Sequence, residues 1–333
     1  MDTTDDTVPT DNTDRSVSFR VLGPVGVVGR SGGLLSLGPP RQRALLAALL
    51  VHPSTALSVD QLTELLWDGS TPPTAATMVH GAVAGLRKAL KSGYGCTAPR
   101  PLVTRDGGYA FDVRPGQLDI HEFERLLAQG RLHLDAAPGR ASRLLDEALA
   151  LWRGPALSGI EQTFARDAAT RWEELRLECL EARMEAEMVL GHHVDVVAEL
   201  EELVARHPFR ERLCAHLIVA LYRCGRQADA LQASRTLRRT LASELGVEPS
   251  SEVQRLEQLL LRHSEALARP VRSFPGTSLP TSFSTFVGRV HEREDISALL
   301  ETHRLVTLTG PGRLGQDTTR CGGRQAPGGP WHS

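Results

Sequence analysis

The sequence has few cysteines and no long apolar run, and these two shortages exclude several classes of protein. Its 333 residues include five cysteines, none in a CxxC pair, so we expect neither a disulfide framework nor a zinc site of paired cysteines. No apolar stretch approaches the roughly 18 residues that a membrane-spanning helix needs. The acidic first residues also lack the pattern of a signal peptide. We therefore expect a cytoplasmic protein without a membrane partner.

The sequence also lacks a recognisable catalytic or metal-binding constellation. His192 and His193 are adjacent, so their side chains should point apart on a turn, and no cysteine or acidic cluster accompanies them. We predict no catalytic residue, no metal site and no cofactor, and therefore a protein that is not an enzyme.

A net charge of -2 over the whole chain hides two regions of opposite sign. Residues 17–115 contain 10 Lys and Arg against 5 Asp and Glu, a net charge of +5. Residues 116–270 contain 20 against 25, a net charge of -5. A basic region joined to an acidic one is typical of a nucleic-acid reader followed by a protein-binding module. Modest imbalances of this kind also occur in proteins that bind no nucleic acid.

The basic region, residues 17–115, follows a tail at 1–16 that we expect to be disordered. Its valine-rich start at 19–28 and the leucines at 34, 35 and 37 predict short strands. Helices are predicted at 41–52, with four buried leucines on one side, and at 59–67, where Ser58 and Gln61 form a capping box. A third helix follows at 74–91. Two β-prone runs around Asp106-Gly107 then predict a hairpin.

The third helix carries an apolar stripe of Val79, Val83, Leu86 and Leu90, which indicates one face packed on a small core. Its opposite face is small and partly basic, a shape that the major groove of DNA admits. The small residues Gly81, Ala84 and Gly85 leave few side chains that could read bases. An ordinary amphipathic surface helix would show the same stripe.

Sheet, three helices and hairpin form the order of an α+β winged helix-turn-helix domain. In that arrangement the third helix enters the major groove and the hairpin wing lies on the backbone or the minor groove. Thr77 and His80 are the candidates for base contacts. The full set of candidate DNA-binding residues is Arg41, Arg43, Thr77, His80, Ala84, Arg87, Lys88, Lys91 and Arg105.

The acidic region, residues 116–268, is rich in amphipathic helical patterns that predict an all-α domain. Gly191 and Gly225 stand 34 residues apart, and His207-Pro208 closes the first unit where a tetratricopeptide (TPR)-like repeat places its proline. Stacked helix pairs of this kind leave a concave face for a partner. The alternative is a plain helical bundle with a coincidental period.

The last part of the chain consists of a Pro/Ser-rich linker at 269–285 and an apparent remnant of a phosphate-binding domain at 286–333. Gly310 and Gly315 fit the spacing of a phosphate-binding loop, but Gln316 and Asp317 occupy the positions of its Lys and Ser/Thr. An amide and a carboxylate facing phosphate would weaken binding, so we expect no ATP hydrolysis. A one-base insertion before a Lys-Thr coding run would produce the observed residues. We therefore expect that this chain is a truncated form of a longer regulator.

The assembled motifs resemble the actinobacterial antibiotic regulatory protein family, in which an OmpR-type winged helix precedes a bacterial transcriptional activation domain. The resemblance covers about residues 17 to 268. It depends on runs such as FRVLGPV, SVDQLTELLW, GGYAFDV, LLDEALALWRGPAL and LYRCGRQADALQA. It implies a nucleoid-associated activator that binds direct repeats in double-stranded DNA near promoters, recruits RNA polymerase and controls a secondary-metabolite gene cluster.

We therefore predict a DNA-binding transcriptional activator that acts as a homodimer on DNA. Two alternatives belong to other classes: a nucleotide-dependent signalling switch, and a helical-repeat scaffold whose winged helix contacts only proteins. Gln316 argues against the switch. A strong salt dependence of DNA affinity would separate the activator from the scaffold.

Overall fold

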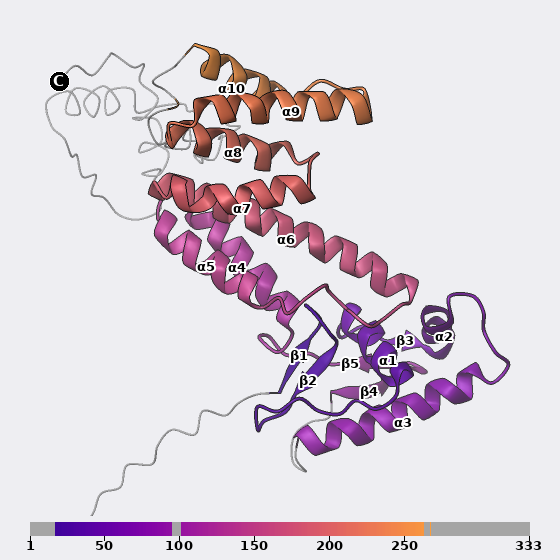
Figure 1. Cartoon of the computed structure of the whole chain (residues 1–333). Coiled ribbons are helices and arrows are strands. Elements are labelled where there is room, and N and C mark those ends of the chain that lie inside the picture. Colours follow the sequence, from indigo (N-terminus) through magenta and orange to yellow (C-terminus); the bar gives the residue numbers. More distant parts are fainter. Residues whose placement is uncertain (1–16, 95–100, 263–266, 268–333) are drawn as a thin grey trace, which may run out of the picture. The chain divides into compact units, whose positions relative to one another are not determined.

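The structure is a computed structural model that describes residues 17–94, 101–262 and 267. All of these lie in the first of the chain's two units, Met1–Arg272. Helices predominate among them, and the few strands are confined to the part of the chain before α4 (Figure 1). The candidate phosphate-loop residues Gly310, Gly315, Gln316 and Asp317 lie outside the described residues.

The chain enters the fold through a two-stranded antiparallel sheet of β1 (Ser18–Arg20) and β2 (Gly26–Val28). The strand expected at the following leucines is reduced to a single bridge between Leu34 and Val28. Gly38 has a left-handed φ of 77° and turns the chain into the first helix, which leaves little length for a third strand.

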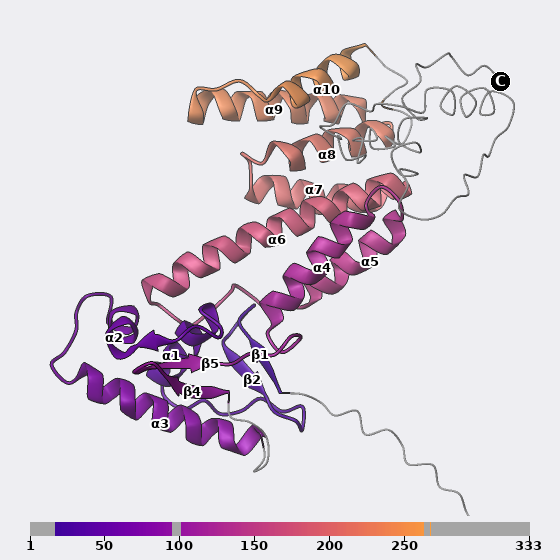
Figure 2. The ribbon, with the colours of Figure 1, turned by 180° about the vertical axis from the view of Figure 1, so that it is seen from behind.

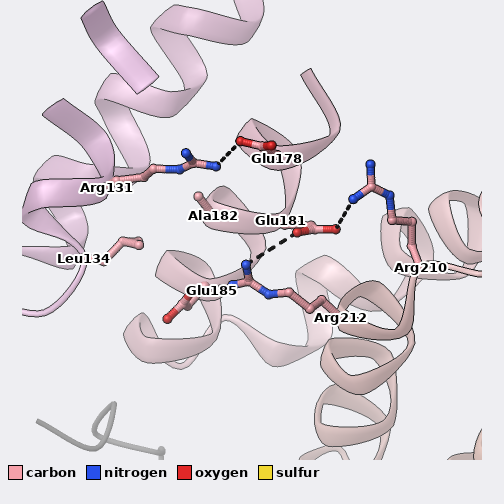
Figure 3. Close-up of a pocket in the computed structure, with 8 residues that line it drawn as sticks. All are labelled: Arg131, Leu134, Glu178, Glu181, Ala182, Glu185, Arg210 and Arg212. Atoms are coloured by element: carbon pink, nitrogen blue, oxygen red, sulfur yellow. Dashed lines mark hydrogen bonds and ion pairs between the residues drawn. The ribbon is translucent and has the colours of Figure 1, made fainter. Parts of the chain in front are cut away.

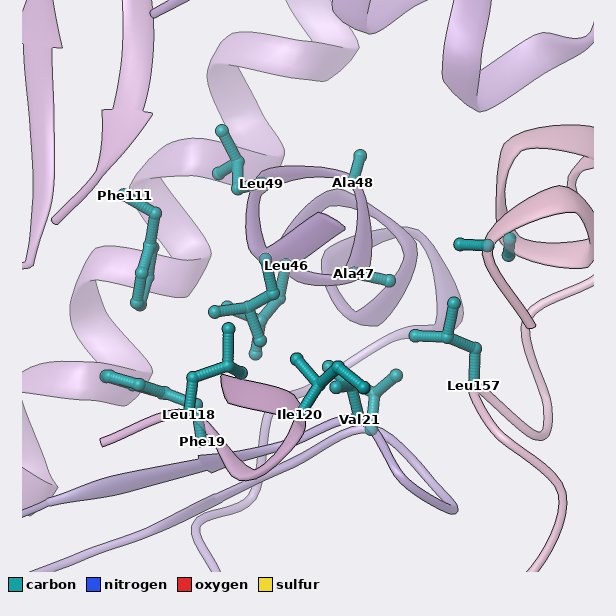
Figure 4. Packing of buried hydrophobic residues seen from close by; sticks show 14 of the residues in the cluster. Phe19, Val21, Leu46, Ala47, Ala48, Leu49, Phe111, Leu118, Ile120 and Leu157 are labelled. Atoms are coloured by element: carbon teal, nitrogen blue, oxygen red, sulfur yellow. The ribbon is translucent and has the colours of Figure 1, made fainter. Parts of the chain in front are cut away.

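Helix α1 (Pro40–Val51) is buried on all sides after its first turn, not on one side as its leucine pattern predicts. Seven consecutive residues, Ala44 to Leu50, are buried, including the alanines between the leucines. The reason is its central position: α2, α3, β5 and α6 all pack against it. Figure 4 shows Phe19, Phe111 and Ile120 close to this helix in the same core.

Helices α2 (Val59–Trp67) and α3 (Ala75–Tyr94) pack on α1 and on each other. The predicted capping box is confirmed: Gln61 N–H donates to Ser58 Oγ at 3.1 Å, and Ser58 N–H donates to Gln61 Oε1 at 2.9 Å. The predicted apolar stripe of α3 is confirmed as well, because all four of its residues are buried.

The expected hairpin consists of β4 (Leu102–Arg105) and β5 (Gly108–Phe111), joined by Asp106 and Gly107. Both turn residues have positive φ, 47° and 75°, which is the conformation that matches the twist of a two-residue hairpin. A short strand that was not predicted, β3 (Leu57–Ser58), pairs with β5 and completes a sheet of order β3-β5-β4. A Cβ at Gly108 would lie 2.2 Å from the Leu57 carbonyl oxygen, so this pairing requires glycine there.

The rest of the described chain is a series of helices in which each packs on the next (Figures 1 and 2). They are α4 (Asp119–His133), α5 (Pro138–Ala150), α6 (Thr163–Leu190), α7 (His193–Arg206), α8 (Glu211–Arg223), α9 (Gln227–Leu245) and α10 (Ser251–Leu261).

The two glycines at the 34-residue spacing each follow the end of a helix in a left-handed backbone conformation. Gly191 follows α6 with φ 89°, and Gly225 follows α8 with φ 75°. The paired positions Val196 and Ala230 are both buried, as are Leu203 and Leu237. The residues that predicted a repeat therefore occupy equivalent places in two successive helix pairs, α7–α8 and α9–α10.

The expected domain boundary at 115 and 116 does not coincide with a break in the packing. One continuous cluster of buried side chains extends from Val17 to Ala182. The rings of Phe19 and Phe111 meet edge to face at 4.9 Å, and Phe19 also forms a bridge with Leu118. The division of the chain into domains at this point stays a prediction.

A buried carboxylate joins these two parts of the chain. Asp119, at the start of α4, accepts hydrogen bonds from the backbone N–H of Val21 at 2.9 Å and of Leu22 at 3.2 Å, and from the Arg153 guanidinium. Burial raises the pKa of the Asp119 carboxyl, whereas these donors and the charge of Arg153 act in the opposite direction. The backbone N–H of Arg153 also donates to the carbonyl of Leu22, in the segment after β1, at 2.9 Å.

Replacing Asp119 by alanine should therefore destabilise the protein strongly. The change leaves two buried N–H groups and a partly buried guanidinium without their partner, which costs about 3–5 kcal/mol for a buried ion pair. Urea unfolding followed by circular dichroism measures the difference. The control is Glu122→Ala in the same helix, which removes an exposed pair with Arg125 and should cost less than about 1 kcal/mol. Equal losses for the two variants would contradict this role of Asp119.

Candidate nucleic-acid interface

The candidate interface is built on the outer face of α3, which no described helix or strand covers in Figures 1 and 2. The buried stripe points towards α1 and α2, so the residues between its members point outwards. The exposed side chains on this face include Thr77, His80, Ala84, Lys88 and Lys91. Five of the candidate DNA-binding residues are thus brought to one face of one helix.

The two lysines of this face are the only lysines in the whole chain. Lys88 and Lys91 stand three residues apart, so they lie on neighbouring turns of the same side of α3. Within the described part of the chain neither makes a hydrogen bond or an ion pair. Their charges are therefore available to an external anion, whereas about half of the arginines of the acidic region are paired with carboxylates.

Arg87, on the side of α3, is in contact with the hairpin. Its Nη2 donates to Thr104 Oγ1 at 2.9 Å, and its guanidinium lies 5.6 Å from the centre of the Tyr109 ring. His80 meets the same ring edge to face at 6.2 Å. Tyr109 therefore links the hairpin to two candidate residues of the helix. Its role was missed in the sequence, because a half-buried tyrosine in a strand gives no signal of the helix that it faces.

Arg105 stands at the end of β4, beside the tip of the hairpin. Its guanidinium pairs with Asp112 at 2.8 Å, and both side chains are substantially exposed. The ion pair holds Arg105 in place on the hairpin. An exposed pair of this kind contributes little to stability, so the guanidinium remains able to exchange its partner for another anion.

Arg41 and Arg43 are exposed at the first turn of α1. The Arg41 guanidinium lies over the Trp67 ring at 4.7 Å and within 3.9 Å of the Met78 sulfur, so it bridges α2 and the start of α3. The side chain of Arg43 has no hydrogen-bond or ion-pair partner among the residues that the structure describes. Both residues lie near the N-terminus of α1, where the helix dipole also favours an anion.

The small residues of α3 divide into two kinds. Gly81 is exposed, and a Cβ there would have no neighbour within 4 Å. Gly85 is half-buried, and a Cβ there would lie 2.1 Å from the Gln42 amide nitrogen of α1. Gly85 is therefore a packing residue and not part of the outer face, which corrects the expectation that it limits base reading. Gly81 and Gly85 lie one helical turn apart, so the sequence alone does not indicate that only Gly85 contacts α1.

Other candidate chemistries find no support in the described chain. His192 bonds to Glu187 at 2.5 Å, and His193 lies 3.5 Å from an Arg223 nitrogen, so the two histidines face different partners. No group of three or more potential metal ligands occurs among the described residues. None of the helices among them is long and apolar enough to cross a membrane.

Comparison with known proteins places the chain among bacterial regulators. Residues 118–261 match the family "Bacterial transcriptional activator domain". The chain is similar to the transcriptional regulator RedD of Streptomyces coelicolor, with 38% identity over 78% of this chain and 73% of that protein. It is also similar to the regulatory protein DnrI of Streptomyces peucetius, with 36% identity over 76% of this chain and 95% of that protein.

The regulatory protein AfsR of Streptomyces griseus is a much longer relative. It is 37% identical over 82% of this chain, but the match spans only 28% of the relative's own length. Among solved structures, Mycobacterium tuberculosis EmbR in complex with a low-affinity phosphopeptide superposes with a TM-score of 0.71. That match has 33% identity and covers 76% of this chain and 68% of the EmbR chain.

The two glycines of α3 should respond differently to alanine. Gly81→Ala should stabilise the protein by about 0.5–1 kcal/mol, because alanine favours the helix and the added methyl group meets open space. Gly85→Ala gains the same helix preference but must displace the Gln42 side chain, so its net effect should be smaller or destabilising. Urea unfolding of both variants measures the difference. A greater gain at Gly85 would show that α1 and α3 are not this close.

Proposed function

This chain belongs to the actinobacterial antibiotic regulatory protein family, and from that premise we propose that it is a DNA-binding transcriptional activator. The observation that carries the proposal is the uncovered face of α3, on which both lysines of the chain stand with no side-chain partner among the described residues. The net charge of +5 over residues 17–115 supports it, because phosphate contacts supply much of the affinity for DNA.

The element order supports a winged helix-turn-helix followed by a TPR-like helical domain. In this proposal α1, α2 and α3 are the three helices, α3 enters the major groove, and the β4–β5 hairpin is the wing. Thr77 and His80 contact base edges, and Ala84 lies close to the bases. The phosphate contacts come from Arg41, Arg43, Arg87, Lys88, Lys91 and Arg105.

These cations differ in the contacts that they make within the protein, and we expect their phosphate contacts to differ accordingly. Lys88, Lys91 and Arg43 have no internal partner within the described chain, so they contact phosphates without giving up another interaction. Arg87 is held against Tyr109 and Thr104, so its contact also depends on the position of the wing. The same contact sets the angle between the wing and α3, because it ties the two elements together near the outer surface.

In this proposal the helical region makes the activator's contacts with other proteins. Its net charge of -5 over residues 116–270 and its stacked helix pairs suit contacts with protein rather than with DNA. We assign it to recruitment of RNA polymerase, by a homodimer bound to direct repeats near the promoters of a secondary-metabolite gene cluster. The protein would act in the cytoplasm at the nucleoid, without enzymatic activity or a cofactor.

DNA binding by the full chain to the promoter regions of the genes beside its own tests the proposal. The double variant Lys88→Ala/Lys91→Ala should weaken binding to all sequences alike and lower the slope of log affinity against log salt by about 2, since each phosphate contact contributes about 0.9. The measurement is fluorescence anisotropy at several salt concentrations.

The matched control is Arg235→Ala/Arg239→Ala, which removes two exposed cations from α9 that have no hydrogen-bond or ion-pair partner among the described residues. It should leave affinity and salt slope unchanged. If the wild-type protein binds no neighbouring promoter even at low salt, the activator proposal fails. If the two double variants lose affinity equally, the α3 interface is wrong.

The rarity of lysine allows a direct map of the interface. Acetylation of the folded protein by a lysine-reactive ester can modify only Lys88, Lys91 and the chain's amino terminus. Bound promoter DNA should slow acetylation of both lysines at least severalfold, because phosphates would cover them, while the amino terminus reacts as before. Mass spectrometry of peptides reads the three sites separately. Equal rates with and without saturating DNA would place the DNA elsewhere.

A further inference from the structure

His80 carries the only side-chain nitrogen in the first half of α3, residues 75–84. The exposed neighbours Ala76, Gly81 and Ala84 end in a methyl group or a hydrogen atom, so they form no side-chain hydrogen bond with a base. Thr77 adds one hydroxyl, which both donates and accepts and therefore fits either kind of base edge. On this half of the outer face, His80 is the side chain best suited to distinguish one base from another.

The wing restricts the His80 ring but occupies neither of its nitrogens. The imidazole meets the Tyr109 ring edge to face, with ring centres 6.2 Å apart and an interplanar angle of 74°. Aromatic pairs favour this arrangement, which limits rotation of the imidazole. The side chain of His80 is exposed, and no residue in the described ranges forms a hydrogen bond or an ion pair with it. Both nitrogens are therefore available to an external partner.

Tyr109 is in turn held by the sheet. It lies in β5, the middle strand of the order β3-β5-β4, and is paired with Leu57 on one side and Thr104 on the other. Its ring also lies 5.6 Å from the Arg87 guanidinium. His80 and Arg87 are seven residues apart, about two turns of the helix, so the ring contacts one side of α3 at two points. The sheet thus places the ring, and the ring places the imidazole.

An imidazole N–H that points into the major groove favours guanine. Guanine presents two acceptors side by side, N7 and O6, whereas adenine places an amino donor beside N7 and cytosine presents an amino donor alone. The O6 atom already accepts a hydrogen bond from cytosine within the base pair, so N7 is the acceptor that is left free. A single N–H donor can therefore select guanine by its N7 atom.

We propose that His80 donates a hydrogen bond to N7 of a guanine in the operator, and that Tyr109 is the positioning residue that aims the imidazole. The inference rests on the proposed function, in which α3 enters the major groove. Phosphates are the same in every sequence, so Arg87, Lys88 and Lys91 contribute affinity without choosing a base. The wing then takes part in base recognition through α3.

Modified bases test the proposal with the unaltered protein. In a neighbouring promoter fragment that the full chain binds, each guanine is replaced singly by 7-deazaguanine, which carries C–H in place of N7 and keeps the base pair. At one or more positions the affinity should fall about fivefold, the worth of one hydrogen bond. Inosine at the same position keeps N7 and O6 and lacks only the minor-groove amino group, so it should preserve the affinity. Competition fluorescence anisotropy measures both.

Variants then assign the contact to His80 and its orientation to Tyr109. The readout is the ratio of affinities for the unmodified and the 7-deazaguanine fragment, in which any change in phosphate contacts cancels. His80→Ala should bring the ratio close to one. Tyr109→Leu and Tyr109→Met remove the ring and should lower the ratio to about two, because binding must then order a free side chain. Tyr109→Phe keeps the ring and should keep the wild-type ratio. Circular dichroism checks that each variant folds.

Three results would overturn the inference while leaving the proposed function intact. They are DNA binding without any position at which 7-deazaguanine weakens it, an equal loss with inosine, and a wild-type ratio in His80→Ala. Adding Tyr109→Leu to His80→Ala should leave the ratio unchanged, and a further change would refute the positioning role of Tyr109. Failure of the wild-type protein to bind any promoter fragment at low salt would instead refute the proposed function itself.

Discussion

The structure depends on one buried carboxylate that serves two parts of the chain at once. Asp119 begins α4, yet its hydrogen-bond donors are the backbone of β1's neighbours Val21 and Leu22 and the side chain of Arg153. Because a buried charge is tolerated only when its donors are in place, the start of α4 can form only against the N-terminal sheet. The apolar cluster from Val17 to Ala182 then closes around this junction. The same junction ties the N-terminal sheet to the first helices of the acidic region.

Within that frame, helix α1 determines where α3 lies. Its seven buried consecutive residues leave no free side, so α2, α3, β5 and α6 are all placed by contact with one element. Tyr109 and Thr104 then hold Arg87 on the inner edge of α3, while the exposed side chains of Lys88 and Lys91 pair with no residue in the described ranges. The planar guanidinium of Arg87 can lie against the Tyr109 ring and donate a hydrogen bond at the same time, whereas the ammonium of lysine is a compact, strongly hydrated charge.

The acidic region uses its charges differently. Arginines link successive helices: Arg183 pairs with both Asp146 of α5 and Glu199 of α7, and Arg238 pairs with Glu257 of α10. Glu181 of α6 is buried, and Arg210 and Arg212 at the start of α8 pair with its carboxylate at 3.9 and 3.6 Å (Figure 3), so charge also links α6 to α8.

The sequence by itself determined the helices, the capping box at Ser58, the hairpin turn and the apolar stripe of α3, because each depends on neighbours within a few residues. It also determined the family, through runs that extend over most of the described chain. Only the tertiary structure decided that α1 is buried all round, that Gly85 packs on Gln42, and that Tyr109 holds Arg87. Those contacts join residues far apart in the chain, so a pattern among neighbouring residues does not indicate them. The DNA contacts assigned to α3 and the wing stay predictions, since they depend on a partner that the chain alone does not contain.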